Sequence, residues 1–331
     1  MSDQRPHCRR KFVLMAGAGV LGAAARPLPA AAQASFPSKP ITIVVLASGG
    51  APDIFSRMMA PSMSDVLGRP VVVEPKPGAA GNVAAATVAR ATPDGHTILM
   101  HSSLLAISPS LYRSLPFNPT KDLVPLSQIA ATEMVVLVRG ESPIRTLADL
   151  AAMGKAHPGK MNFASAGNGT IVHLAGELLK RRTGTDMVHV PYKGSAPGLI
   201  ALMGDEVQVS VDVVPVALPH VRSGRLRALA VASDTRSAAL PQVPTTAEAG
   251  FPGFEIASWN GFFVPAGTPP EVMRKLHEAI AHAMAQPQVK DRMAEMGAVP
   301  MATSQRQFQA FFDAEVSRFA QIVQEANVTA E

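Results

Sequence analysis

The sequence is poor in cysteine and in charge. Cys8 is the single cysteine among 331 residues, and it lies in an N-terminal segment that we expect to be removed. A mature chain without cysteine has no disulfide and no thiol nucleophile, so packing alone must hold the fold. Charged residues make up 17% of the chain and hydrophobic residues 47%, which supports a large core and excludes a disordered or collagen-like protein.

The small excess of positive charge is confined to the N-terminus. Residues 1–34 hold five basic residues and one acidic residue, a net charge of +4, so only +1 of the chain's +5 remains for the other residues. A body this close to neutral offers no surface that follows a phosphate backbone. We therefore expect no nucleic-acid partner.

Common catalytic and metal-binding motifs are also missing. The chain contains no G-x-S-x-G, no H-E-x-x-H and no G-x-x-x-x-G-K-[ST]. The nine histidines are dispersed: His173 is followed four residues later by Glu177, and His277 and His282 are five residues apart, which does not match the common zinc spacings. We expect no catalytic residue, no metal and no cofactor, and we interpret His173 as a structural histidine rather than a ligand contact.

Residues 1–34 have the features of an export signal. Arg9-Arg10-Lys11 precedes an apolar stretch and Ala32-Gln33-Ala34 is a small-residue cleavage site, which predicts a mature periplasmic chain that begins near Ser35. The basic run resembles a twin-arginine signal, with an ordinary secretory signal as the alternative. The apolar stretch of roughly 14 residues is shorter than the roughly 17 to 25 of a membrane-spanning helix, which disfavours a permanent anchor. The G-x-G-x-x-G at 17–22 follows no strand and predicts no nucleotide site.

From Lys39 onward, short apolar runs alternate with amphipathic stretches, which predicts an α/β protein with mostly parallel sheets. The runs expected to form strands are 41–46, 71–74, 97–100, 134–138, 162–164, 188–190, 207–211, 226–231 and 261–264. The stretches expected to form helices are 53–67, with Asp53 as its N-cap, 81–91, 171–182, 269–285 and 304–326.

No linker separates two independent domains, so two lobes would have to share extended crossover strands. The candidate crossovers are 133–142 and 255–264. Two crossings place both chain ends in one lobe and the middle of the chain in the other. We expect lobe 1 to contain 35–138 and 260–331, and lobe 2 to contain 139–259.

Two strand-to-helix turns are built of glycine and small polar residues. Ser48–Asp53 follows the first expected strand, and Ser165–Thr170 follows a middle strand. Glycine lets a backbone approach a ligand, and the free N–H groups in the first turn of a helix attract anions such as carboxylates. Ligands of open α/β sheets bind at the carboxyl ends of strands, so the two turns are expected to face each other across a cleft. The alternative is that both are ordinary capping turns.

An ordered set of short motifs covers residues 36–331. In the first third of the chain these are S-K-P-I (38–41), G-G-x-x-D (49–53), G-R-P-V-V-V-E (68–74), P-G-A-A-G-N (77–82) and P-D-G-H-T (93–97). Farther along they are A-S-A-G-N-G-T (164–170), H-V-P-Y-K-G (189–194), G-R-L-R-A-L-A-V (224–231), L-P-Q-V-P-T (240–245), W-x-G (259–261) and P-A-G-T-P (265–269). In this order they resemble the tripartite tricarboxylate transporter substrate-binding proteins, also called the Bug family of periplasmic solute receptors.

This resemblance implies a two-lobed, type II periplasmic-binding-protein fold that closes on a small carboxylate, dicarboxylate or amino acid. In that family, two loops grip a ligand carboxylate like pincers, partly through ordered waters and backbone groups. Carried over to this chain, the ligand-binding residues are Ala47, Ser48, Gly49 and Asp53 in the first loop and Ser165, Asn168, Gly169 and Thr170 in the second.

Three further residues are placed near the cleft by the order of the strands. Ser102 follows the third strand, and Asp212 follows the strand at 207–211. Asp212 is expected either to accept a ligand amine or to cap a helix. Trp259 is either a wall of the cleft or a core residue.

The departures from the family pattern concern the ligand. Leu46-Ala47-Ser48 lacks the aromatic residue that the family often has in this loop, and Leu104-Leu105 stands where Thr-His is common. Fewer polar groups predict a more apolar pocket, suited to an aromatic or branched carboxylate rather than to citrate.

The resemblance implies a binding protein with a membrane permease as its partner. We expect a monomer, because such a receptor must hand over its cargo. One alternative is a periplasmic sensor that presents its bound form to a membrane kinase. Another is an exported α/β enzyme, which the fold does not exclude but which the missing catalytic motifs disfavour.

Overall fold

The computed structural model describes residues 36–326 and 328–329, and these form one compact unit. The predicted signal peptide at 1–34, with Cys8 and the glycine-rich motif at 17–22, lies outside the described residues. Among the helices of residues 36–326, none is long and apolar enough to cross a membrane.

Ten strands pair in the order β2-β1-β3-β9-β4-β7-β5-β6, and β8 and β10 each pair with β4. Their bounds are β1 Ile41–Val45, β2 Val71–Pro75, β3 Thr97–Ser102, β4 Leu123–Arg139, β5 Met161–Ser165, β6 Met187–Pro191, β7 Val209–Val213, β8 Leu226–Val231, β9 Ala257–Pro265 and β10 Val299–Pro300.

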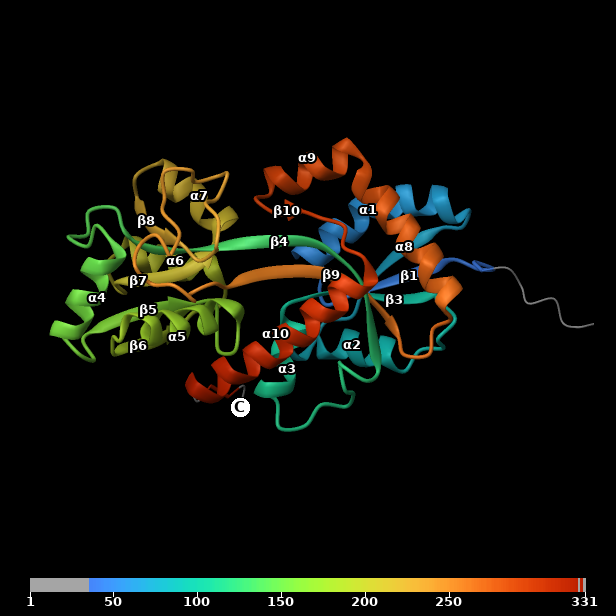
Figure 1. The fold of residues 1–331 in the computed structure, drawn as a ribbon, viewed down its shortest axis with the longest axis horizontal. Coiled ribbons are helices and arrows are strands. Elements are labelled where there is room, and N and C mark those ends of the chain that lie inside the picture. Colours follow the sequence, from blue (N-terminus) through green and yellow to red (C-terminus); the bar gives the residue numbers. More distant parts are fainter. Residues whose placement is uncertain (1–35, 327, 330–331) are drawn as a thin grey trace, which may run out of the picture. The chain divides into compact units, whose positions relative to one another are not determined.

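The long strand β4 takes part in two halves of the sheet. Residues 123–133 of β4 pair with β9, whereas 134–139 pair with β7 and β8. We call β2, β1, β3, β9 and the first part of β4 the first half-sheet, and β6, β5, β7, β8 and the second part of β4 the second half-sheet. β9 returns beside β4 in the opposite direction (Figure 1), so these two strands are the crossovers expected from the sequence.

The α/β prediction is confirmed, but the expectation of mostly parallel strands is wrong. The pairs β1–β2, β1–β3, β5–β6 and β5–β7 are parallel, whereas every pair that involves β4 or β9 is antiparallel. The reason is topological. One crossover leaves the first half-sheet and the other comes back, so the two must run in opposite directions beside each other.

The N-terminal half of β4 was not predicted, since the expected strand started at 134. Pro125 interrupts the apolar run, and a proline inside a run argues against a strand. In the structure the β4–β9 register shifts between Pro125 and Ser127 and again between Gln128 and Ala130. Such irregularities accommodate a proline that cannot donate to the ladder.

Helices cover both faces of each half-sheet, although only five were expected. Their bounds are α1 Ala51–Leu67, α2 Asn82–Ala89, α3 Leu104–Leu111, α4 Leu147–Ala156, α5 Ile171–Thr183, α6 Ser195–Met203, α7 Val214–Arg222, α8 Pro270–Ala285, α9 Pro287–Glu295 and α10 Gln305–Ala326, with a short 3₁₀ turn at Ala79–Gly81. On the first half-sheet, α1 and α8 pack on one face, and α2, α3 and α10 pack on the other. On the second half-sheet, α6 and α7 lie on one face and α5 on the other.

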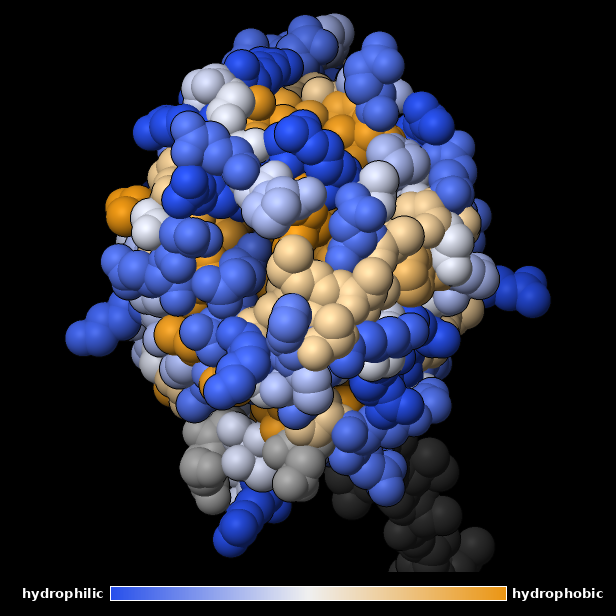
Figure 2. Space-filling model, turned by 90° about the vertical axis from the view of Figure 1, so that its left-hand side faces the viewer, coloured by the Kyte–Doolittle hydropathy of each residue, from blue (hydrophilic) through white to orange (hydrophobic). Residues whose placement is uncertain are grey.

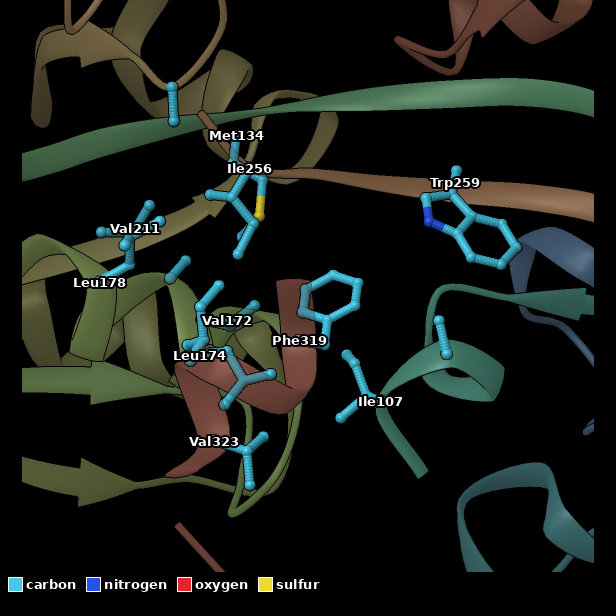
Figure 3. Close-up of a cluster of buried hydrophobic side chains, with 14 of the residues drawn as sticks. Ile107, Met134, Val172, Leu174, Leu178, Val211, Ile256, Trp259, Phe319 and Val323 are labelled. Carbon is cyan, nitrogen blue, oxygen red and sulfur yellow. The ribbon is translucent and has the colours of Figure 1, made fainter. Parts of the chain in front are cut away.

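One hydrophobic cluster joins the two half-sheets. Figure 3 shows Ile107 of α3 near Phe319 of α10, which in turn lies near Val172 and Leu174 of α5, and all four side chains are buried. Helix α10 therefore packs against elements of both half-sheets.

Trp259 is a core residue, which decides between the two roles left open by the sequence. Its side chain is 1% exposed, and its ring meets Phe308 and Phe312 of α10 edge-on. The indole Nε1 donates to Glu315 Oε2 at 3.0 Å, and Arg318 contacts the other carboxylate oxygen at 2.9 Å. Burial raises the pKa of Glu315, while the nearby Arg318 and the Trp259 hydrogen bond oppose that rise.

Apolar side chains that remain at the surface are scattered. Exposed large hydrophobic residues are spread over several elements, for example Ile54 and Val66 on α1, Val188 on β6 and Ile200 on α6. The face shown in Figure 2 is mainly hydrophilic, with small hydrophobic patches between charged and polar groups. Most of the apolar surface of both half-sheets is thus buried under helices.

Candidate functional site

The carboxyl ends of the parallel strands face one another from the two half-sheets. β4 runs from the first half-sheet to the second, and β1 and β3 run in the same direction as β4. β5, β6 and β7 run against β4, toward the first half-sheet. This is the arrangement in which loops at opposed strand ends can enclose a ligand.

The registers give the size of the gap along β4. Ser102 at the end of β3 pairs with Asn260 of β9, which in turn pairs with Ala130 of β4. Val213 at the end of β7 pairs with Met134 of β4. These positions on β4 are four residues apart, and at ~3.3 Å per residue the opposed strand ends are separated by about 13 Å. That distance is comparable to the length of a small molecule.

The first loop, residues 46–50, follows β1 and is fixed by one carboxylate. Gly49, in the left-handed region with φ +78°, donates its N–H to Asp53 Oδ2 at 2.9 Å. Arg57 Nε donates to the other oxygen, Oδ1, also at 2.9 Å. Asp53 is buried, and each of its carboxylate oxygens accepts a hydrogen bond from the protein. Ser48 and Gly49 are exposed.

The expected N-cap at Asp53 is wrong by three residues. Helix α1 begins at Ala51, with Gly50 as N-cap and no side-chain cap. Pro52 explains the earlier start, because proline needs no N–H in the first turn and its φ is already helical. Asp53 therefore acts from inside the first turn, where its charge also favours the helix N-terminus.

The second loop, residues 165–170, follows β5 and is held by hydroxyl groups. Ser165 Oγ accepts the Gly167 N–H at 3.1 Å, and Thr170 Oγ1 donates to the Gly167 carbonyl at 2.8 Å. Thr170 is the N-cap of α5, since its hydroxyl accepts the N–H of His173 at 3.3 Å. This helix was expected at 171–182 and spans Ile171–Thr183. Asn168 is exposed at the tip of the loop.

Gly169 marks where the second loop approaches the other half of the molecule. Its φ is +72°, and a Cβ built on it would lie 2.7 Å from Leu111 Cδ1 of α3. The loop is therefore in contact with a helix that follows β3 of the first half-sheet. Both the conformation and the contact require glycine here.

Two histidines make hydrogen bonds with the second loop, although the sequence assigned neither of them to this loop. His173 Nδ1 accepts the Gly169 N–H at 3.1 Å, and His189 Nε2 lies 2.6 Å from Ser165 Oγ. The two imidazole rings are stacked at 3.7 Å between centroids, with Phe163 stacked on His189 at 4.9 Å. Burial, together with the positive charges of His189 and Lys180, lowers the pKa of His173 to about 4. Burial, together with the charge of Lys180, lowers the pKa of His189 to about 4. His173 is structural, as expected from the sequence, but its hydrogen bond goes directly to the loop.

Asp212 ends β7 as a buried carboxylate. Its Oδ1 accepts from Ser195 Oγ at 2.7 Å and from the Val213 N–H at 2.8 Å, and the residue is 1% exposed. Burial raises its pKa to about 6. The helix-capping alternative is wrong, because Val213 is the N-cap of α7 and that helix has no side-chain cap. Instead, Asp212 ties β7 to Ser195, the first residue of α6.

The structure thus sorts the expected site residues into local groups. Ala47, Ser48, Gly49 and Asp53 share the first loop, while Ser165, Asn168, Gly169 and Thr170 share the second. Ser102 and Asp212 end β3 and β7 on either side of the crossovers. The largest cavity described, about 890 Å³, contains none of them and lies between α7 and the end of α9. In the part of the chain that the structure describes, no group of three or more His, Cys, Asp or Glu side chains could hold a metal ion.

Comparison with known proteins agrees with this architecture. The sequence profile of the tripartite tricarboxylate transporter family receptors matches residues 55–328. The chain belongs to this family. Its members are solute-binding receptors rather than enzymes, and the chain has their two-lobed periplasmic-binding-protein fold.

Individual relatives are similar over nearly their whole length. Protein BugT of Bordetella pertussis is 36% identical over 315 residues, which cover 94% of this chain and 97% of BugT. The structure of R. palustris Rpa4515 with adipate is 32% identical with a TM-score of 0.76 and covers 89% of this chain and 99% of that one. MatC from Rhodopseudomonas palustris with bound malate is 32% identical with a TM-score of 0.73, covering 87% and 100%. This family receptor is therefore similar to proteins that carry dicarboxylates.

Proposed function

We propose that this chain captures a small carboxylate between its lobes in the periplasm and delivers it to a tripartite tricarboxylate-type membrane transporter. The observation that carries the proposal is the pair of glycine-containing turns at opposed strand ends, each leading into a helix N-terminus. Family membership supports it, as do the dicarboxylates bound by Rpa4515 and MatC. Capture is a binding event in this proposal, with no catalytic step.

Backbone N–H groups are the proposed grip on the carboxylate. In the second loop, the N–H groups of Gly167 and Gly169 are engaged by side chains. No acceptor is described for the N–H of Asn168 or of Ile171, which opens α5. Such groups at a helix N-terminus bind anions without a cationic side chain. The opposite side of the ligand is contacted in this proposal by Ala47, Ser48 and Gly49. Asp53 holds their loop in its conformation through the hydrogen bond with Gly49.

Ser102 and Asp212 are proposed to line the space between the two loops. Both hydrogen bonds described for Asp212 go to Oδ1, which leaves Oδ2 for a ligand amine or hydroxyl. Leu46 and Leu104 flank the first loop and the end of β3, which supports a ligand with an aromatic or branched apolar part rather than citrate.

Lobe 1 is proposed to contain 35–138 and 260–331, and lobe 2 139–259. The registers support a hinge close to these limits, since β4 changes partners after Glu133 and β9 begins at Ala257. We also propose that residues 1–34 are removed near Ala34 and that the receptor is monomeric.

A thermal-shift screen of the chain from Ser35 tests the binding function. The panel comprises adipate, malate, citrate, benzoate, a branched aliphatic carboxylate and the neutral amides of these acids. A ligand at a hundred times its Kd stabilises the native state by about 2.7 kcal/mol, which is readily measured as a rise in Tm. We expect a rise with at least one monocarboxylate or dicarboxylate, a smaller rise with citrate and none with the amides.

A matched pair of threonine variants assigns that shift to the second loop. Thr170→Ala should remove most of the shift, whereas Thr87→Ala, an exposed position on α2, should leave it unchanged. Equal shifts with an acid and its amide would contradict the carboxylate grip. Solute uptake that depends on this receptor separates the transporter from the sensor, for which kinase output would respond to the ligand instead.

A further inference from the structure

Behind the second loop, two histidines make hydrogen bonds that depend on where their protons are. Gly169 N–H can only donate, so His173 Nδ1 must accept and carry no proton. The proton of the neutral ring is then on Nε2, which faces Glu177 Oε1 at 3.9 Å. Both His173 and Glu177 are nearly buried, so bulk water offers little substitute for these contacts.

His189 makes the equivalent contact at the start of the loop. Ser165 Oγ already accepts the Gly167 N–H, and it lies nearer to His189 Nε2, at 2.6 Å, than to the Gly167 carbonyl, at 3.3 Å. The hydroxyl hydrogen is therefore assigned to the His189 contact, with Nε2 as acceptor. Both rings thus accept a hydrogen bond from the loop, one from its first residue and one from its fifth.

We propose that His173 and His189 are positioning residues that hold residues 165–170 in the ligand-gripping conformation, and that this support lasts only while Nδ1 of His173 carries no proton. This inference rests on the proposed role of that loop in binding a carboxylate. His173 is the sensitive member. A proton on its Nδ1 would place two N–H groups against each other, whereas a protonated His189 could still donate to Ser165 Oγ.

The surroundings of the two rings favour their neutral forms. His189, on β6, stacks on His173, so two imidazolium rings would repel each other at 3.7 Å. Lys180 and Glu177 lie on α5 with His173. Lys180 adds positive charge, and Glu177, which contacts both Lys180 and His173, opposes that charge. Other elements packed on α5 also carry ionisable groups. β7 has Asp212, and α10 has Arg306, Asp313, Glu325, which is paired with Arg181, and Glu315, which is paired with Arg318. Burial and the neighbouring positive charge lower the pKa of both histidines to about 4.

Protonation must therefore favour the released loop. A histidine released into solvent has its ordinary pKa of 6.5, whereas in the closed loop the pKa is about 4. The released state binds more protons between these values, so the closed loop loses stability as the pH falls below about 6.5, and the loss is complete near pH 4. For His173 alone, the ratio of closed to released loop falls between pH 7.5 and pH 5 by at most about thirty-fold, the limit reached when release exposes the whole ring to solvent.

Amide hydrogen exchange of Gly169 in the ligand-free protein tests the inference without any assumption about the ligand. After correction for intrinsic exchange, we expect its protection to fall several-fold, and at most about thirty-fold, between pH 7.5 and pH 5. His173→Asn keeps an acceptor for the Gly169 N–H but cannot titrate, so its protection should be high at both pH values. His173→Leu should show low protection at both, and His157→Asn, an exposed histidine elsewhere in the second lobe, should behave as wild type.

Wild-type protection that does not change with pH, or a His173→Asn variant that loses as much as wild type, would overturn the inference. Should His173→Leu not fold, the comparison of wild type with His173→Asn still decides the question. Adipate titrated into wild type and His173→Asn supplies the second arm. Protonation of adipate weakens binding to both proteins at pH 5, so the inference expects a larger loss of affinity in wild type than in His173→Asn. If Gly169 behaves as expected but no carboxylate binds at either pH, the histidine support stands and the proposed function fails.

Discussion

The two glycine-containing loops both follow the carboxyl end of a parallel strand and lead into a helix, but they are stabilised by different chemistry. The first depends on a carboxylate, Asp53, held between a backbone N–H and the guanidinium of Arg57. The second depends on neutral groups, the hydroxyls of Ser165 and Thr170 and two uncharged imidazoles. The first loop is therefore held by a charged pair and the second by neutral groups, so the pH response proposed for the histidines belongs to the second loop.

Replacing a loop glycine by alanine should give the largest difference in stability between the two loops. Gly169→Ala combines a left-handed φ with a Cβ 2.7 Å from Leu111, and we expect a loss of about 3 kcal/mol in the free energy of unfolding. Gly49→Ala has a similar φ but nothing within 4 Å of its Cβ, so about 1 kcal/mol is expected. Urea denaturation measures both. Equal losses would show that the contact with α3 contributes nothing.

A second comparison concerns Asp212, whose pH dependence has the opposite sign to that of the histidines. Its pKa is about 6 in the native protein and 3.8 in the unfolded chain, so the native state binds more protons between these values and gains stability as the pH falls through 6. At pH 7.5 the buried charge is unfavourable. Asp212→Asn keeps an acceptor for Ser195 and should raise the free energy of unfolding by about 2 kcal/mol at pH 7.5.

The control for Asp212→Asn is the same measurement at pH 4, where the native carboxyl is protonated and the variant should gain little. Ser195→Ala, which removes the hydrogen-bond donor, should destabilise at both pH values. A stabilisation of Asp212→Asn that is equal at pH 4 and pH 7.5 would rule out the titration of this carboxyl as its cause.

The smallest expected effect comes from the polar groups that shape each loop. Asp53→Ala removes the acceptor of Gly49 N–H and Thr170→Ala removes an N-cap, and each should cost about 1 kcal/mol of stability. Added salt should reduce the loss only for Asp53→Ala, because only that variant breaks an ion pair. Thermal unfolding at low and high ionic strength makes the measurement. The same salt response in both variants would remove the distinction between the two loops.

The sequence predicted the conformation of the second loop better than it predicted the side chains that hydrogen-bond to that loop. Glycine at 167 and 169 with Thr170 before an amphipathic stretch is a local signal, and the helix begins where Thr170 caps it. His189 lies 24 residues from Ser165, and their contact arises only because β5 and β6 pair in register. Local patterns carry no information about which strands become neighbours.

Prolines account for much of what was missed in the fold. Pro125 concealed the first part of β4, and Pro52 moved the start of α1. Helices α3 and α7 each contain a proline in their sixth residue, Pro109 and Pro219, where sequence rules predict a break. Tertiary packing overrides that local cost, since Ile107 of α3 and Ala217 of α7 are fully buried.

The C-terminal helix has a mechanical consequence. Phe308 and Phe312 anchor the beginning of α10 against β9, while Glu325 near its end pairs with Arg181 of α5, and Val323 lies among the side chains of α5 (Figure 3). The helix is thus attached at both ends to different half-sheets. In the proposed closure of the two lobes, a rotation of one lobe would have to stretch, slide or release one of these attachments, so α10 would limit how far the proposed site opens.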